Sequence, residues 1–495
     1  MPTRPPLGAR TPTALVATVL LVVIALLAVI GGGEAGAQDG TSDSSVEAAA
    51  PASLATPVLS ARRIPWLLQG AVADPVLAAA IRGTIDRNPA TWCALVEDRG
   101  RPVVDVHPDL ALAPASVQKL LTGAAFLEAF GPDHTLRTVL VAAQGPVDGV
   151  VEGDLFVVGG GDPLFTTAGY QEAFDDPGQP SVDPAVLADA LVAAGVTRIR
   201  GGVVGDDSRY DAERWVSTWP NRYRSDPSIG PISALAINDG FTGYAAAPER
   251  ANPNRRAGDP PLLAAETLIT IFEAKGIAVD GGPSTGVAPE GATEVAGVDS
   301  LPMRDLVGEM VLASDNNTAE MLLKELGLAR KGQGSSAAGL AAATEVLTGL
   351  GLPVEGMALR DGSGLDPESR VPCAAVMAVL DRYGRASDLT THLAEAGRTG
   401  TLRPRLGGED TVGRVFAKTG TLNTVNGLAG WAETQGGAVL QFVGIGNGVD
   451  PRGRGASDAF ARALMTYPEG PSVQVLGPLP VLPAGSGPPD TTAPG

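Results

Sequence analysis

The chain has 495 residues, too many for one compact core and enough for two or three domains. Hydrophobic residues make up 44% of it and charged residues 18%, which is typical of a globular protein. The net charge of −19 argues against nucleic acid or an anionic membrane surface as the main partner. The three histidines are scattered without ligand spacing, so we predict no metal site and no Ser-His-Asp triad.

Residues 1–37 have the features of an export signal. Two arginines precede an apolar run over residues 14–30, and Ala35-Gly36-Ala37 supplies the small residues of a cleavage site. The 17-residue run is long for a signal core and short for a membrane span, so a retained anchor is the alternative to cleavage. Both alternatives place the folded part outside the cytoplasm, in the cell wall or secreted. A flexible spacer rich in Ala, Ser, Asp and Pro is predicted over 38–61.

Two strands around a turn are predicted over 91–98 and 102–106, followed by a helix with apolar positions between 120 and 127. Ser116 and Lys119 stand three residues apart at the start of this helix, and Pro114 suits its first turn. Positions i and i+3 share a helix face, so the lysine amine can reach the serine hydroxyl. A desolvated, neutral lysine can take the proton of such a serine and make it a nucleophile.

The scarcity of lysine makes this pair informative. Of the 36 basic residues, only five are lysines and 31 are arginines. Arginine stays protonated in proteins, whereas a buried lysine can lose its proton. A helix cap followed by an exposed lysine is the alternative interpretation of the pair taken alone.

Residues 135–295 have a different pattern, dominated by strands and turns. Strands are predicted over 150–158 and 199–207, and helices over 184–195 and 262–275. The glycine run at 159–161 opens no helix, so we interpret it as a turn and not as a phosphate loop. No residues here have catalytic spacing. The clustered acidic residues are interpreted as a solvated surface, with a cation site as the alternative.

Helical patterns return over 303–312 and 318–328, and the tripeptide Ser314-Asp315-Asn316 lies between them. Strands are predicted over 415–421, 427–431 and 438–443, followed by a helix over 458–465 and a disordered Pro/Gly-rich tail over 468–495. Cys93 and Cys373 are the only cysteines. Their apolar surroundings are compatible with a disulfide bond and equally with two buried thiols.

Three motifs occur in chain order: Ser116-x-x-Lys119, Ser314-Asp315-Asn316 and Lys418-Thr419-Gly420. Together they resemble the motif set of class A β-lactamases and penicillin-binding proteins. Ser116 and Ser314 are 198 residues apart. This spacing resembles the class C low-molecular-mass penicillin-binding proteins, the D-alanyl-D-alanine carboxypeptidase/endopeptidase family, in which nested domains interrupt the catalytic domain. Further stretches that match this family are Gly160-Gly161-Asp162-Pro163, Asp361-Gly362-Ser363-Gly364-Leu365 and Gly400-Thr401-Leu402.

The resemblance extends from about residue 62 to 467. It implies an α/β (α+β) fold of the β-lactamase/transpeptidase type, with an antiparallel sheet flanked by helices. The catalytic domain would comprise 62–134 and 296–467, and a strand-rich nested insert would occupy 135–295. The substrate would be a peptidoglycan stem peptide ending in D-Ala-D-Ala, cleaved without a cofactor by carboxypeptidase or DD-endopeptidase action. β-Lactams would be covalent inhibitors, and nucleic acid would not be a partner.

The resemblance also implies a role for each motif residue. Ser116 would attack the substrate carbonyl, Lys119 would accept the proton, and Ser314 would help to return it to the leaving nitrogen. The remaining motif residues would bind the oxyanion, the peptide backbone or the terminal carboxylate: Asn316, Lys418, Thr419, Gly420 and Thr421. A β-lactamase or esterase with the same machinery and a non-catalytic cell-wall-binding protein are the alternative functions.

Overall fold

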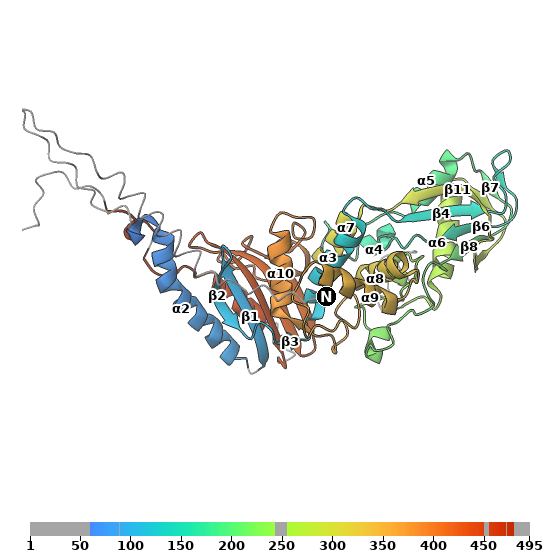
Figure 1. Ribbon diagram of the computed structural model, residues 1–495. Helices are drawn as coiled ribbons and strands as arrows, with labels where there is room; N and C mark the ends of the chain where they lie inside the picture. Colours follow the sequence, from blue (N-terminus) through green and yellow to red (C-terminus); the bar gives the residue numbers. More distant parts are fainter. Residues whose placement is uncertain (1–59, 89, 243–254, 450–454, 472, 480–495) are drawn as a thin grey trace, which may run out of the picture. The chain divides into compact units, whose positions relative to one another are not determined.

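The computed structural model describes residues 60–88, 90–242, 255–449, 455–471 and 473–479 (Figure 1). The predicted signal peptide over 1–37 and the spacer up to residue 59 lie outside these ranges. Among the described helices, none is both long and apolar enough to cross a membrane. The described chain starts with a 3-10 turn at Ala61–Arg63 and continues into helix α2 (Pro65–Asp86).

A six-stranded antiparallel sheet has the order β13-β14-β15-β16-β1-β2, so the first strands of the chain pair with the last. Its strands are β1 (Thr91–Asp98), β2 (Arg101–Val106), β13 (Ala394–Glu395), β14 (Val415–Leu422), β15 (Val425–Glu433) and β16 (Val439–Asn447). Successive side chains of a strand point to opposite faces. On β16, Leu440 and Phe442 belong to one hydrophobic cluster, whereas Val443 and Ile445 belong to another. The sheet is therefore buried on both faces.

Helices cover both faces of this sheet (Figure 1). On one face, α2 and α11 (Gly455–Leu464) pack against it through Leu77 and Phe460. The second face carries a larger group of helices: α3 (Lys119–Phe130), α7 (Met303–Leu312), α8 (Asn316–Lys331), α9 (Ser336–Gly349) and α10 (Cys373–Tyr383). The short strands β3 (Ala111–Leu112) and β12 (Val371–Pro372) pair beside them. This arrangement agrees with the α/β (α+β) fold class predicted from the motifs.

The two cysteines form a disulfide bond, which answers the question that the sequence left open. Cys93 lies on β1 and Cys373 is the first residue of α10, 280 residues further along the chain. The bond joins the sheet to the helical layer above it. Both side chains are fully buried.

Between α3 and α7 the chain forms a second sheet with its own hydrophobic core. The strand order is β10-β8-β6-β4-β11, with β10, β8 and β6 parallel and β4 and β11 antiparallel to their neighbours. Helices α5 and α6 contribute Leu187, Leu268 and Phe272 to its core. The elements are β4 (Arg137–Ala142), β5 (Val150–Val151), β6 (Leu155–Val158), α4 (Ala168–Gln171), α5 (Ala185–Ala193), β7 (Arg198–Ile199), β8 (Val203–Asp206), α6 (Pro260–Ala274), β9 (Ala278–Val279), β10 (Pro283–Thr285) and β11 (Thr293–Asp299). Because this segment enters on β4 and leaves on β11, which pair with each other, it can be inserted without separating α3 from α7.

The predicted strands over 150–158 and 199–207 are each divided in two. Their interruptions lie against each other: the Gly201 amide donates to the Gly153 carbonyl at 2.8 Å, and the Gly202 amide donates to the Asp154 carboxylate at 2.7 Å. The first halves of the two runs, β5 and β7, join β9 in a separate three-stranded parallel sheet. The alternation of apolar and polar residues within one strand does not reveal these interruptions, because they depend on contacts between two segments that are far apart in the chain.

A second part of the insert, between β8 and α6, packs on the helical layer of the larger sheet. Trp219 and Tyr223 belong to a hydrophobic cluster that also contains Met321 of α8 and Leu365. This segment includes two 3-10 turns, Asn221–Arg224 and Asn238–Gly240. The insert therefore packs against α8 through hydrophobic contacts, in addition to its covalent connections to α3 and α7.

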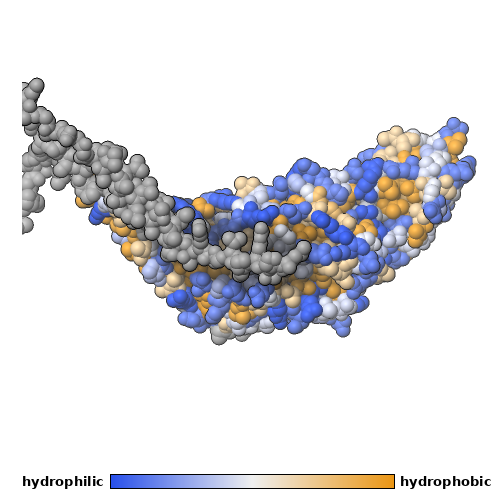
Figure 2. All heavy atoms as spheres, in the orientation of Figure 1, coloured by the Kyte–Doolittle hydropathy of each residue, from blue (hydrophilic) through white to orange (hydrophobic). Residues whose placement is uncertain are grey.

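The predicted disordered tail over 468–495 lies partly outside the described residues, which here are 468–471 and 473–479. These described residues differ from the prediction. They include α12 (Val473–Leu476), which packs near α2, where the Arg62 guanidinium donates to the carbonyl of Val475 at 3.3 Å and to that of Gly477 at 3.4 Å. Figure 2 shows hydrophobic and hydrophilic residues interspersed over the face seen there. Single exposed apolar residues of this kind are normal for a soluble surface.

Candidate active site

Ser116 lies on a tight turn in front of a buried helix. The turn is a 3-10 helix, Ala115–Gln118, and α3 begins only at Lys119, so the predicted first helical turn is more tightly wound than an α-helix. Ala115 has a φ of +48°, a conformation that non-glycine residues rarely adopt. Such backbone strain is typical of functional turns that the surrounding packing holds in place.

The Lys119 amine makes three hydrogen bonds. Its Nζ lies 3.0 Å from Ser116 Oγ, 2.6 Å from Asn316 Oδ1 and 2.8 Å from the Ser363 carbonyl oxygen. The side chain is fully buried. Burial lowers the pKa of Lys119 to about 8, although the nearby carboxylates of Asp315, Asp361, Glu320 and Glu309 oppose this shift. The amine is therefore held close to the serine hydroxyl and is easier to deprotonate than an exposed lysine.

The Ser314-Asp315-Asn316 motif forms the start of α8. Asp315 is the N-cap, and its carboxylate accepts from the Thr318 amide at 2.7 Å. Asn316 is therefore the first residue of the helix. Its side-chain oxygen Oδ1 faces Lys119, and its Nδ2 donates to the Ser228 carbonyl of the insert at 2.7 Å. Ser314 lines the cavity and has a φ of +63°. The described hydrogen bonds of the Lys119 amine do not include one to Ser314.

The Lys418-Thr419-Gly420 motif lies on β14, beside the serine turn. Lys418 is fully buried and its amine donates to the Thr419 carbonyl at 3.1 Å. Burial, followed by the charges of Lys119 and Arg405, holds the pKa of Lys418 well below its usual value. Thr419 lines the cavity, and its hydroxyl donates to that of Thr401 at 2.8 Å.

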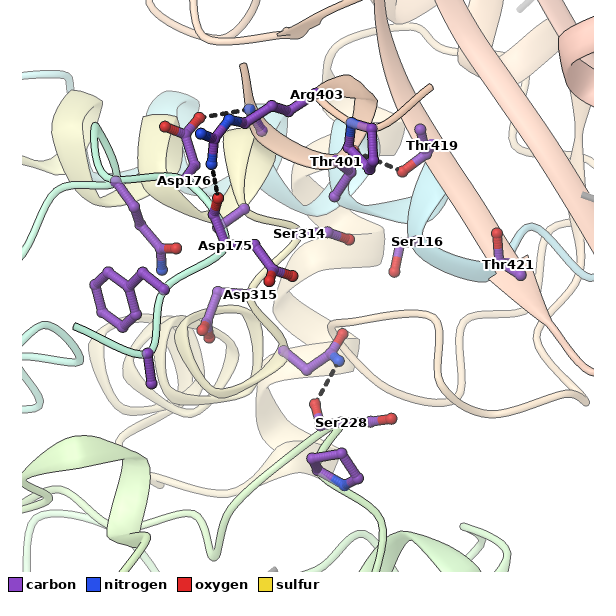
Figure 3. A pocket seen from close by; sticks show the side chains of 18 of the residues that line it. Ser116, Asp175, Asp176, Ser228, Ser314, Asp315, Thr401, Arg403, Thr419 and Thr421 are labelled. Atoms are coloured by element: carbon purple, nitrogen blue, oxygen red, sulfur yellow. Dashed lines mark hydrogen bonds between the residues drawn. The ribbon is translucent and has the colours of Figure 1, made fainter. Parts of the chain in front are cut away.

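Gly420 and Thr421 occupy different surroundings. Gly420 is packed against the serine turn: a Cβ at this position would lie 2.7 Å from the Pro114 carbonyl oxygen, so only glycine allows β14 to approach so closely. Thr421, one residue further, lines the cavity (Figure 3). Of the eight residues selected from the sequence, Ser116, Ser314, Asn316, Thr419 and Thr421 line the cavity, whereas Lys119, Lys418 and Gly420 lie behind its wall.

The cavity in front of Ser116 has a volume of about 1070 Å³. The insert forms much of the opposite wall, with Tyr170, Phe174, Pro227, Ser228 and Asp239. No site residue was predicted within the insert, because no spacing within it marked these positions. Phe174, Pro227 and Ser228 reach the cavity from segments between the regular elements. Tyr170 lies in α4, and Asp239 lies in the 3-10 turn Asn238–Gly240.

One segment of the insert, residues 170–179, is attached to the turn at 400–403 (Figure 3). The Asp176 carboxylate accepts from the Gly400 amide at 2.5 Å, and the Arg403 guanidinium donates to the Asp175 carbonyl. The Gly400 turn carries Thr401, the hydroxyl partner of Thr419. The insert thus supports the residues that face Ser116.

Several carboxylates lie together behind and along this wall. Asp239 accepts from the Tyr170 hydroxyl at 2.8 Å, and Glu309 accepts from Gln179 at 2.9 Å and from Thr318 at 2.9 Å. Burial raises the pKa of Asp239 and of Glu309 well above the usual range, and Asp315 adds to both shifts. Asp239 on the insert and Glu309 on α7 therefore favour their neutral, protonated forms.

Comparisons with known proteins agree with this geometry. The model of the D-Ala-D-Ala carboxypeptidase 3 (S13) family matches residues 77–254 and 242–466. The D-alanyl-D-alanine carboxypeptidase of Actinomadura sp. (strain R39) is 28% identical over 468 residues, covering 80% of this chain and 83% of that protein. A carboxypeptidase of Mycobacterium tuberculosis is 31% identical over 372 residues, covering 72% and 76%. The crystal structure of penicillin binding protein 4 from Haemophilus influenzae has a TM-score of 0.63 and 22% identity, covering 78% of this chain and 98% of that chain.

A buried lysine beside a serine, next to an antiparallel sheet flanked by helices, is typical of the serine DD-peptidases and of the class A β-lactamases that share their motifs. The chain belongs to the D-Ala-D-Ala carboxypeptidase 3 (S13) family, because the family model matches most of its length. It is a serine-type carboxypeptidase, a hydrolase of the penicillin-binding-protein type whose family acts outside the cytoplasm. The family resemblance drawn from the motifs is confirmed.

Proposed function

We propose that Ser116 is the nucleophile and Lys119 the general base that cleaves the D-Ala-D-Ala end of a peptidoglycan stem peptide. The observation that supports this proposal is the 3.0 Å distance between Lys119 Nζ and Ser116 Oγ, inside a buried hydrogen-bond network. A neutral amine has two N–H bonds and one lone pair. The fixed acceptors Asn316 Oδ1 and Ser363 O take both N–H bonds, so the lone pair points toward the Ser116 hydroxyl.

In the acylation step, Ser116 Oγ forms a bond to the carbonyl carbon of the penultimate D-alanine, and its proton moves to Lys119 Nζ. The backbone amides of Ser116 and Thr421 stabilise the oxyanion. The bond from that carbon to the nitrogen of the last residue then breaks, and the leaving nitrogen receives the proton from Lys119 through the Ser314 hydroxyl. Water releases the acyl group and regenerates the serine. The same cut in a cross-link is an endopeptidase reaction.

Substrate binding falls to the motif residues around the serine. The Nδ2 group of Asn316, which donates to the Ser228 carbonyl, would donate to the backbone of the bound substrate peptide in its place. The terminal carboxylate lies against the hydroxyls of Thr419 and Thr401, with Lys418 behind the strand as the counter-charge. Burial holds the pKa of Lys418 well below its usual value, and a bound carboxylate would raise it by favouring the charged form. Gly420 serves this site by allowing β14 to lie against the serine turn.

The organisation of the whole chain follows from the same proposal. Residues 62–134 and 296–467 form the catalytic domain, and 135–295 form the insert, whose separate core supports this division. Residues 1–37 act as a signal peptide that directs the enzyme to the cell wall or the medium, with a retained membrane anchor as the alternative.

The proposal is tested with benzylpenicillin, whose lactam mimics D-Ala-D-Ala. The penicillin binding protein 4 of Haemophilus influenzae has been crystallised in complex with a β-lactam. We expect the intact mass of this chain to rise by one drug, and the modified peptide to contain Ser116. The Ser116→Ala variant should give no adduct. An adduct on another residue, or none on the folded protein, would overturn the assignment. Rapid turnover of a chromogenic β-lactam would instead favour a β-lactamase.

A further inference from the structure

The loop from Asp361 to Asp366 supplies the Ser363 carbonyl that holds the Lys119 amine. Two buried carboxylates, those of Asp361 and Glu320, accept hydrogen bonds from four backbone amides of this loop. Asp361 accepts from the amides of Gly364 and Asp366 at 2.8 and 2.7 Å, and from the Trp219 indole at 2.8 Å. The loop also contacts the serine turn directly, because Gln118 Nε2 donates to the Asp361 carbonyl at 2.6 Å.

The second carboxylate, Glu320, binds the two backbone amides that precede the Ser363 carbonyl in the chain. It accepts from the Gly362 amide at 3.0 Å and from the Ser363 amide at 2.8 Å. The side chain is fully buried and does not line the cavity, so it cannot touch the substrate. Its hydrogen bonds fix the orientation of the peptide unit next to the one that contacts Lys119.

Glu320 and Asn316 are four residues apart on α8, and they therefore share one helix face. Asn316 contacts the Lys119 amine directly, and Glu320 contacts it through the Ser363 loop. The loop is packed closely between α8 and the serine turn: at Gly364, which has a φ of +83°, a Cβ would lie 2.1 Å from the Ala115 carbonyl oxygen. One face of α8 thus positions both acceptors of the Lys119 amine, Asn316 Oδ1 directly and the Ser363 carbonyl through Glu320.

We propose that Glu320 is a positioning residue for the general base: it holds the Ser363 carbonyl so that the lone pair of Lys119 points at Ser116. This inference rests on the proposed role of Lys119 and extends it to a residue outside the three motifs. Since the lone pair is oriented only when both acceptors are in place, loss of the Glu320 contacts slows acylation without weakening the non-covalent binding of the substrate.

Glu320 also belongs to the charges around Lys119. The amine is faced by Asp315 and Glu320 of α8, Asp361 of the loop and Glu309 of α7, all of which raise the pKa of Lys119. Lys418 on β14 also lies near, and, together with burial, the charge of Lys119 contributes to lowering the pKa of Lys418. Burial raises the pKa of Glu320 itself to about 8, so its carboxylate becomes charged in the pH range in which Lys119 loses its proton. Removing this carboxylate lowers the pH at which Lys119 becomes neutral, a change that a purely structural residue elsewhere on α8 does not cause.

The test compares Glu320→Gln with the wild type by stopped-flow acylation with a fluorescent penicillin between pH 6 and pH 10. A glutamine offers one oxygen and an N–H₂ group to two backbone amides that both need acceptors. We expect the plateau acylation rate constant to fall about 10- to 100-fold, the dissociation constant of the initial complex to change less than about threefold, and the midpoint of the pH profile to move to lower pH. Glu320→Asp keeps the negative charge but has a shorter side chain. Its plateau acylation rate constant should therefore also fall, with a smaller shift of the pH midpoint than in Glu320→Gln.

The matched control is Glu325→Gln, a buried glutamate on the same helix whose partner is Arg209 at 2.6 Å. It should lower the unfolding temperature and leave both the plateau rate and the midpoint at wild-type values. Glu320→Asp carries the test if Glu320→Gln does not fold. Wild-type rates and midpoints in both Glu320 variants would overturn the inference while leaving Ser116 as nucleophile. Absence of acylation in the wild type would instead refute the proposed function.

Discussion

The two walls of the cavity are built in different ways. On the first wall, Ser116, Asn316 and Thr419 lie on a 3-10 turn, a helix start and a strand, where packing fixes the backbone. On the second wall, Phe174 and Ser228 lie on segments of the insert between regular elements. The first wall holds atoms close to their reaction geometry, whereas the second surrounds a space large enough for a peptide. We infer that the first wall determines the rate of the chemical step and the second determines which peptides bind.

The largest expected effect separates the two lysines that lie behind the first wall. In the proposed mechanism Lys119 must lose a proton, whereas Lys418 needs its charge, so the arginine variants of the two should differ. Lys119→Arg should reduce acylation by a fluorescent penicillin about 100- to 10,000-fold or more, because guanidinium stays protonated. Lys418→Arg keeps the cation and should retain measurable acylation with weaker substrate binding. Circular dichroism would confirm that both variants fold.

Both lysines are fully buried, so the comparison is matched for burial as well as for the substitution. If Lys119→Arg acylates as fast as Lys418→Arg, then Lys119 is not the base. The assignment of proton transfer to Lys119 and of a purely electrostatic role to Lys418 would then be wrong.

A smaller effect is expected on the second wall. Asp176→Asn replaces a carboxylate that accepts from the amides of Gly178 and Gly400 at 2.9 and 2.5 Å, so one amide loses its acceptor. Because the Gly400 turn carries Thr401 beside Thr419, we expect KM for a D-Ala-D-Ala peptide to rise about 3- to 10-fold, with kcat changed less.

The control for this wall is Asp183→Asn. The Asp183 carboxylate also accepts from a backbone amide, that of Ala185 at 2.9 Å, but Asp183 does not line the cavity. This substitution should leave KM unchanged. A fall in kcat alone for Asp176→Asn would show that the insert acts on the chemical step, and would remove the difference between the two walls.

The first wall was largely predictable from the sequence because its chemistry depends on short spacings. Ser116 and Lys119 are three residues apart, and a helical turn of any tightness brings them together. The antiparallel strand that carries Thr419 followed from local patterning and from the family resemblance. The motif order alone did not show that Lys418 and Gly420 lie behind the wall, because which side chains reach a cavity depends on packing between distant elements.

The second wall was not predictable, because its contacts join residues far apart in the chain. Asp176 and Gly400 are 224 residues apart, and Asn316 and Ser228 are 88 apart. Neither pair follows a periodicity or a motif. Glu320 was missed for a similar reason: it is one of many polar residues on an amphipathic helix, and only the fold brings the Ser363 loop against it.

The central claim, that a neutral Lys119 activates Ser116, is tested most directly by the pH dependence of acylation in the wild-type enzyme. Burial lowers the pKa of Lys119 to about 8, so below this pH the neutral fraction, and with it the acylation rate, should rise about tenfold per pH unit. The rate should level off above pH 8 to 9, measured with a fluorescent penicillin over pH 6 to 10. A rate that is constant across this range, or that falls as the pH rises through 8, would contradict the claim.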